Sequence, residues 1–239
     1  MGAALSKAKR TAHDFDLFPL FRLNFASPGV GPVMIIAVDG PAASGKGTIA
    51  RALAAHFGLP HMDTGLLYRA TAKNLLEMGG DPESEFAAAR ATDLSQIDFS
   101  DPELKSETVG GIASRISAYS HVREALLERQ RRFAAQDGGA VLDGRDIGTV
   151  IAPEAEVKLF VTARPEVRAR RRFDELKARG LDVHFADVLA DIEARDERDT
   201  GRAAAPLAMA ADAQLIDTSD MDVATAIAAA IAAVRPIEA

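Results

Sequence analysis

The stretch MIIAVDGPAASGKGT occupies residues 34–48, and its pattern predicts the fold. An apolar run from Met34 ends at Asp39, a glycine-rich loop runs from Gly40 to Thr48, and the next residues have helical spacing. A strand, a glycine loop and a helix in this order are typical of a phosphate-binding loop, whose backbone N–H groups point at phosphate oxygens. The stretch therefore predicts a P-loop NTPase fold of the α/β class that binds a nucleoside triphosphate.

Every residue of the loop is a candidate for contact with ATP: Gly40, Pro41, Ala42, Ala43, Ser44, Gly45, Lys46, Gly47 and Thr48. Gly40 and Gly45 allow close approach of the backbone, and Lys46 can bridge the outer phosphates. The usual pattern places Ser or Thr directly after the lysine, where it binds Mg²⁺, whereas here Gly47 intervenes before Thr48. The GKGT form resembles nucleoside monophosphate kinases, and the absence of an N/T-K-x-D motif argues against a GTPase.

Composition limits the remaining classes. The chain has 239 residues, of which 48% are hydrophobic, enough for one large domain or one domain with an inserted lid. There is no run of about 18 apolar residues, and there is no cysteine for a disulfide, a thiolate metal site or a nucleophile. The net charge of −7 argues against nonspecific binding of nucleic acid. We expect a cytoplasmic monomer that binds neither nucleic acid nor membrane.

The chain divides at Met34. Residues 1–33 contain four phenylalanines without a clear period, and we expect a poorly ordered, dispensable extension, with Met34 as the real or an alternative start. Residues 34–239 alternate strand and helix patterns, which predicts a parallel sheet of about five strands flanked by helices. We expect strands over 33–39, near His61, and over 140–143, 157–162 and 214–217. We expect helices over 46–57, 65–78, 121–135, 165–179, 185–200 and 223–234.

Two segments interrupt or decorate this alternation. Residues 79–105 are polar and predict an insertion outside the sheet. Residues 170–183 are short, charged and punctuated by Gly180, which predicts a lid that excludes water from the site. The run from Arg164 to Arg172 contains five arginines against one acid, Glu166. It is either a solvated helix face or, beside a phosphate loop, a clamp for a triphosphate.

The motif AVLDGRDIGTV at residues 140–150 contains a second candidate acid. Asp143 follows an apolar strand, the position from which a carboxylate reaches Mg²⁺, often through water. The alternative is a simple Asp-Gly turn. Arg145 and Asp146 follow and can present a guanidinium and an acceptor to the same cleft.

Two further motifs carry charged side chains at helical spacing. In DTGLLYR, residues 63–69, Asp63 or Thr64 can cap a helix, and the Tyr-Arg pair that ends the motif can hold a second phosphate-bearing ligand. In EARDERDTGR, residues 193–202, Arg195, Asp199 and Arg202 are spaced i, i+4 and i+7. That spacing also suits an exposed ladder of ion pairs, and it does not by itself decide between the two interpretations.

Taken together, the motifs from residue 34 to about 236 resemble bacterial cytidylate kinases. The matching strings are DGPAASGKGT, DTGLLYR, HVREALLERQRRF, LDGRDIGTV and RDERDTGRAAAPL followed by AADAQLIDT. Adenylate kinases share the loop but usually carry DGFPR where this chain has DGRDIG. The chain departs from the family pattern at two places. Members of the family often have Ser where this chain has Thr64. Many relatives also have a longer insertion with extra strands, whereas residues 79–105 are short.

The resemblance implies transfer of a phosphoryl group from ATP to CMP, and to dCMP, with Mg²⁺ as cofactor. It implies an acceptor-binding insertion over 79–120 and an acceptor site made of Thr64, Tyr68, Arg69, Ser114, Arg123, Arg145, Asp146, Arg195, Asp199 and Arg202. We expect the catalytic cations to be Lys46, Arg145, Arg195, Arg171 and Arg172, the last two in the lid. We expect Mg²⁺ near Thr48 and Asp143, the latter through water.

The chemistry of the bases agrees with a cytosine acceptor. Cytosine offers its N4 amine as a donor, which Asp146 can accept, whereas uracil places an acceptor oxygen there. Arg123 can donate to the same base, and Asp199 can accept from a sugar hydroxyl. The alternatives are a kinase for UMP or AMP, and an ATP-binding regulator without activity. The five histidines form no recognisable catalytic pair, so we expect each to be structural or exposed.

Overall fold

The computed structural model describes residues 34–234. Residues 1–33, for which we predicted a poorly ordered extension, and residues 235–239 lie outside the described part of the chain. Within 34–234, none of the helices is both long and apolar enough to cross a membrane.

Five parallel strands form one sheet in the order β2–β3–β1–β4–β5. Their bounds are β1 Met34–Asp39, β2 His61–Asp63, β3 Gly139–Gly144, β4 Val157–Thr162 and β5 Gln214–Asp217. Because the strands are parallel, their carboxyl ends share one edge, where open α/β sheets bind their ligands. The register places Asp63 beside Asp143 at this edge.

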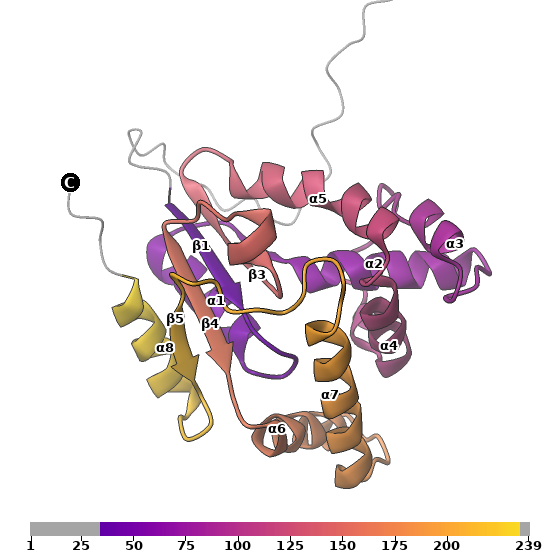
Figure 1. Cartoon of the computed structure of the whole chain (residues 1–239). Helices are drawn as coiled ribbons and strands as arrows, with labels where there is room; N and C mark the ends of the chain where they lie inside the picture. Colours follow the sequence, from indigo (N-terminus) through magenta and orange to yellow (C-terminus); the bar gives the residue numbers. More distant parts are fainter. Residues whose placement is uncertain (1–33, 235–239) are drawn as a thin grey trace, which may run out of the picture.

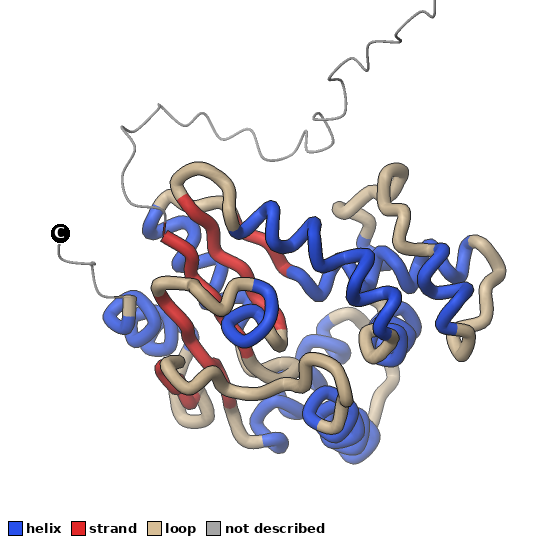
Figure 2. The backbone as a smooth tube through the Cα atoms, turned by 45° about the horizontal axis from the view of Figure 1, so that its top comes forward, coloured by secondary structure: helices blue, strands red, loops and turns tan. Residues whose placement is uncertain are grey.

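Helices cover both faces of the sheet (Figures 1 and 2). They are α1 Lys46–Phe57, α2 Thr64–Glu77, α3 Glu85–Arg90, α4 Glu107–Ile116, α5 Ser120–Ala134, α6 Pro165–Ala178, α7 Phe185–Thr200 and α8 Val223–Ala233, with a 3₁₀ turn η1 at Pro102–Lys105 and a π turn η2 at Ile147–Ile151. Alternate side chains of β1 face opposite ways: Ile36 and Val38 pack with α1 and α8. Ile35 and Ala37 pack with α2, α4 and α5. This alternation places one apolar core on each face of the sheet.

The predicted fold class is confirmed, and the predicted elements are close to those observed. The strand predicted to start at 33 begins at 34 in the described part, and the helices over 46–57 and 185–200 have the predicted bounds. No helix was predicted between 79 and 120, but α3, η1 and α4 lie there, beyond the sheet at the far end of α2 (Figure 1). Ser84 caps α3 and Ser106 caps α4 with their hydroxyl oxygens.

Asp39 fixes the chain where it leaves β3. Its carboxylate accepts the backbone N–H groups of Ile147 and Gly148, both at 2.8 Å. These groups begin the π turn, in which the N–H of Ile151 reaches back to the carbonyl of Asp146 at 3.2 Å. Burial raises the pKa of Asp39 to about 6, although both N–H groups oppose the rise. The end of β1 therefore positions the segment that carries Arg145 and Asp146.

We expect Asp39→Asn to remove part of the pH dependence of folding. Because its pKa is raised, Asp39 binds its proton more tightly in the folded protein than in the unfolded chain. Its contribution to the free energy of unfolding is therefore fully present at pH values below the unfolded pKa of 3.8. It is lost as the pH rises through about 6. The free energy of unfolding of the wild type relative to the variant should fall by at most about 3 kcal/mol between about pH 4 and about pH 7. Urea unfolding measures this difference, and a constant difference would contradict it.

Candidate active site

The glycine loop wraps around the N-terminus of α1. Gly40 lies so close to β4 that a Cβ there would be 2.0 Å from the carbonyl oxygen of Val161. Ala43 and Gly45 both have positive φ, 58° and 91°, which turn successive backbone N–H groups inward. Lys46 donates to the carbonyl of Pro41 at 3.2 Å. Burial, followed by the charge of Arg145, lowers the pKa of this lysine to about 7, against the opposing carboxylates of the strand ends.

A large cavity of about 600 Å³ opens in front of this loop. Its walls come from the loop, α4 and the hairpin of α6 and α7. Of the loop residues predicted to contact ATP, those that line it are Ala42, Ala43, Gly45, Lys46, Gly47 and Thr48. The volume suits a nucleotide.

A second, smaller cavity of about 50 Å³ holds the whole predicted acceptor set. All ten predicted residues line it: Thr64, Tyr68, Arg69, Ser114, Arg123, Arg145, Asp146, Arg195, Asp199 and Arg202. These ten residues come from α2, α4, α5, the segment after β3, α7 and the segment that follows α7. The two cavities share Arg69, Ser114 and Arg195, so they meet along these side chains.

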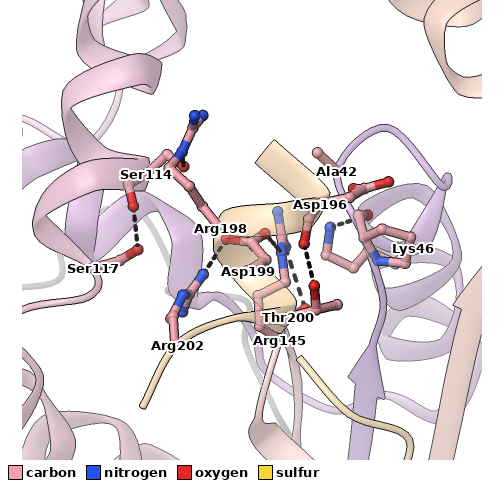
Figure 3. Close-up of polar contacts among 12 residues, drawn as sticks. Ala42, Lys46, Ser114, Ser117, Arg145, Asp196, Arg198, Asp199, Thr200 and Arg202 are labelled. Atoms are coloured by element: carbon pink, nitrogen blue, oxygen red, sulfur yellow. Dashed lines mark hydrogen bonds and ion pairs between the residues drawn. The ribbon is translucent and has the colours of Figure 1, made fainter. Parts of the chain in front are cut away.

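Asp199 is the centre of the charged network in the small cavity (Figure 3). One of its oxygens accepts from Arg145 Nε at 2.7 Å, and the other accepts from Arg202. Burial alone would raise the pKa of Asp199, but the two arginines outweigh it and lower the pKa to about 2. Its side chain is only 1% exposed. The alternative of an exposed ladder of ion pairs over 193–202 is therefore wrong for this carboxylate.

A second ion pair closes the other side of the small cavity. Arg123 donates to Asp146, and its guanidinium also lies over the ring of Tyr68, 6.0 Å from the centroid. Burial raises the pKa of Asp146, although Arg123 and Arg202 oppose the rise. Because these groups pair with one another across the cavity, they must exchange partners when a ligand occupies it.

Arg195 is a poorly compensated cation of the site, without any ion pair within residues 34–234. Its Nε is buried and has no hydrogen-bond partner among the described residues. Burial and then the charge of Arg145 lower its pKa to about 9, and only Asp199 opposes them appreciably. Arg69 and Arg198 add further positive charge nearby. An anion bound where the two cavities meet would satisfy this side chain.

The acids of the strand ends face the loop. The hydroxyl of Thr64 donates to the carbonyl of Asp143 at 2.9 Å. Asp63 is the N-cap residue of α2, but its side chain accepts no capping hydrogen bond, although the sequence suggested that it could. Burial and then the charge of Asp143 raise the pKa of Asp63, and Lys46 opposes them.

The lid arginines have different surroundings. Arg171 donates to the carbonyl of Thr218 at 2.6 Å and to that of Ser44 at 3.5 Å, so it lies against the loop. Arg172 pairs with Glu107 of α4 and Glu175, and it lines the large cavity. Arg171 of α6 thus contacts the phosphate loop and the end of β5, and Arg172 of α6 contacts α4.

Sequence reasoning missed two contributors. Arg168 was noted only as part of an arginine run, but it is buried and donates to the loop carbonyl of Ala42 at 3.2 Å. It also forms a two-bond pair with Asp196 of α7, at 3.0 and 2.5 Å. Nε2 of His61 donates to Oδ1 of Asp143 at 2.7 Å, although no histidine was expected to join a functional group. Its position two residues before Asp63 on the same strand was the available signal.

Comparison with known proteins agrees with these motifs. The family described as Cytidylate kinase matches residues 36–236. The chain belongs to the cytidylate kinase family. It is 60% identical over 205 residues to a cytidylate kinase of Xanthobacter autotrophicus, covering 84% of this chain and 97% of that one. It is 57% identical over 203 residues to a cytidylate kinase of Methylocella silvestris, covering 84% and 94%.

The family is one of phosphotransferases, so the chain is an enzyme of that class. Among solved structures, an uncharacterized protein from Eubacterium ventriosum ATCC 27560 is similar with a TM-score of 0.48 and 16% identity. That match covers 83% of this chain and 96% of the other.

We expect Arg168→Lys to lower the affinity for ATP about tenfold, because lysine cannot make the two-bond pair that joins the loop to α7. Titration calorimetry with a non-hydrolysable ATP analogue measures this. Arg164→Lys is the matched control: it loses a two-bond pair with Asp220 at the surface, where both partners are more than half exposed. Equal effects in the two variants would contradict the role of Arg168.

Proposed function

We propose that the chain transfers the γ-phosphoryl group of ATP to the phosphate of CMP, and of dCMP, by direct in-line attack. One observation carries this proposal: Arg195 is buried without full compensation at the place where a large cavity beside the phosphate loop meets a smaller one lined by charged groups. Two phosphate-bearing ligands, one in each cavity, would bring their phosphates together at this side chain.

In the proposed reaction, the loop binds the donor phosphates and the arginines stabilise the charge of the transfer. An acceptor phosphate oxygen forms the new P–O bond, the bond to the β-phosphate oxygen breaks, and its electron pair leaves with ADP. Lys46, Arg145 and Arg195 neutralise the charge that builds up during the transfer, with Arg171 and Arg172 of the lid hairpin beside them. The lowered pKa of Lys46 in the unliganded site rises again when phosphates bind, because their negative charge favours the ammonium form.

Mg²⁺ fits the groups at the strand ends. Asp63 and Asp143 are adjacent carboxylates, and the raised pKa of Asp63 reflects burial together with their mutual repulsion. Thr48 lines the same cavity. Mg²⁺ is usually held by one or two carboxylates plus substrate phosphates, so this small set is sufficient. We propose that Thr48 and Asp143 hold the ion, the latter through water; when bound, it neutralises charge on the β- and γ-phosphates.

The acceptor is proposed to be selected by Asp146 and Arg123. A cytosine N4 amine can donate to Asp146 in place of the Arg123 guanidinium, which is freed to donate to the base. Uracil would place an acceptor oxygen against this carboxylate, which is also an acceptor, so the contact would be unfavourable. Asp199 is proposed to accept from the 3′-hydroxyl of the sugar, which both CMP and dCMP carry. A kinase that prefers UMP or AMP is the alternative that an acceptor panel distinguishes.

We expect a panel of acceptors with ATP to rank CMP and dCMP well above UMP and AMP. Asp146→Asn should narrow the ratio of kcat/KM for CMP over UMP by about 10-fold or more, because the amide can donate to the uracil oxygen. A coupled assay of ADP release gives each value. A ratio unchanged in the variant would remove Asp146 from base selection, and a wild type that prefers UMP or AMP would contradict the proposed acceptor.

We expect Arg145→Ala to lose turnover far more than affinity for ATP. The guanidinium lines the small cavity and not the large cavity in front of the loop. Arginines that stabilise the charge of phosphoryl transfer contribute on the order of 10³–10⁵ in rate. Because the substitution also leaves Asp199 with one arginine fewer, unfolding should be measured beside single-turnover rates. A variant that folds and turns over at a near-normal rate would refute the assignment.

A further inference from the structure

His61 makes a hydrogen bond that the mechanism above does not use. Its Nε2 lies 2.7 Å from Oδ1 of Asp143, and both side chains are shielded, at 13% and 4% exposure. Since an ionised carboxylate can only accept, the imidazole donates through Nε2. The two residues come from neighbouring strands, β2 and β3, whose register brings them within reach.

The bond leaves the second carboxylate oxygen facing the phosphate loop. A Cβ built on Gly47 would lie 3.6 Å from Oδ2 of Asp143, so this oxygen points at the residue directly after Lys46. The main chain of Asp143 is held separately by the hydroxyl of Thr64. Both the backbone and the side chain of Asp143 are therefore fixed from the same short segment, residues 61–64.

Without His61, the carboxylate of Asp143 could turn toward other interaction partners. Lys46 is an attractive partner because it lies among the same charges, and Asp63 repels the group from the neighbouring strand. A rotation of Asp143 toward the lysine would remove Oδ2 from the loop. Histidine–carboxylate contacts of this kind commonly orient groups around bound metals, and losing one typically weakens metal binding about 10- to 100-fold.

We propose that His61 is a positioning residue: by holding Oδ1 of Asp143, it keeps Oδ2 directed at the phosphate loop and thereby strengthens binding of the Mg²⁺ form of the donor nucleotide. The proposal rests on the placement of Mg²⁺ near Asp143 given under Proposed function. The gain is largest for the metal-bound donor, because His61 itself lines neither the large cavity nor the acceptor cavity.

The test compares nucleotide binding with and without the ion. A non-hydrolysable ATP analogue is titrated into the full-length protein by calorimetry, once with excess Mg²⁺ and once with EDTA. His61→Leu should weaken binding about tenfold in Mg²⁺ and clearly less in EDTA, where only the contact between Asp143 and Lys46 changes. His61→Gln, whose amide nitrogen can replace Nε2, should restore most of the difference. His61→Asn, which is too short to do so, should behave like His61→Leu.

His121→Leu is the matched control. It removes a histidine–carboxylate hydrogen bond of similar length, 2.8 Å to Glu85, on the exposed surface of the acceptor insertion. It should leave binding unchanged in both solutions. In an Asp143→Asn background, His61→Leu should have no further effect on binding in Mg²⁺.

Three results would overturn the proposal: equal weakening in Mg²⁺ and EDTA, no change in either, or additive losses in the double variant. The three His61 substitutions also allow the comparison if one of them fails to fold. Failure of the proposed function is separate, because it would show as a wild type that does not phosphorylate CMP. The binding measurements do not depend on turnover.

Discussion

The site depends on how few carboxylates are available to balance its buried cations. Asp199 holds Arg145 and Arg202, and Asp146 holds Arg123. Burying a charge is costly unless it is paired, so these two acids fix where the arginines lie. Arg195, which lies between the two cavities and has no such partner of its own, has a lowered pKa as a result. The folded chain therefore carries incompletely compensated positive charge at this site.

The sheet supplies the frame for this arrangement. Parallel strands bring Asp39, Asp63 and Asp143 to one edge, although more than a hundred residues separate the first from the last. The first of these acids accepts two backbone N–H groups, whereas the other two face the phosphate loop. The residues that directly follow these acids in the sequence lie at the same edge of the sheet. Arg145 and Asp146, which follow Asp143, are placed in this way.

Much of this could be read from the sequence because the signals were local. The phosphate loop is one continuous segment, and the strands on either side are apolar runs with clear ends, so the order of elements was predictable. The ten acceptor residues were named from a family resemblance, and the structure brings them into one cavity. Helices α3 and α4 were missed because they are short, and Gly110 and Gly111 weaken the helical pattern of α4. Their serine caps were the signal that could have revealed them.

Contacts between distant segments could not be read in the same way. Neither the pairing of His61 with Asp143 nor that of Arg168 with Asp196 follows from spacing, since each joins separate elements. The short insertion, expected to set this chain apart, is not peculiar to it: the match covers 97% of the Xanthobacter autotrophicus relative. That relative therefore has little sequence left over for a longer insertion.

The contact between Arg172 of α6 and Glu107 of α4 has a consequence for how the enzyme exchanges its ligands. Together with the bond from Arg179 to the carbonyl of Lys105, it ties the hairpin to the insertion across the large cavity. Glu107 is half exposed, so dissolved ions screen this attraction. We therefore expect higher ionic strength to weaken the attraction between the two arms and to make nucleotide release sensitive to the salt content of the surrounding solution.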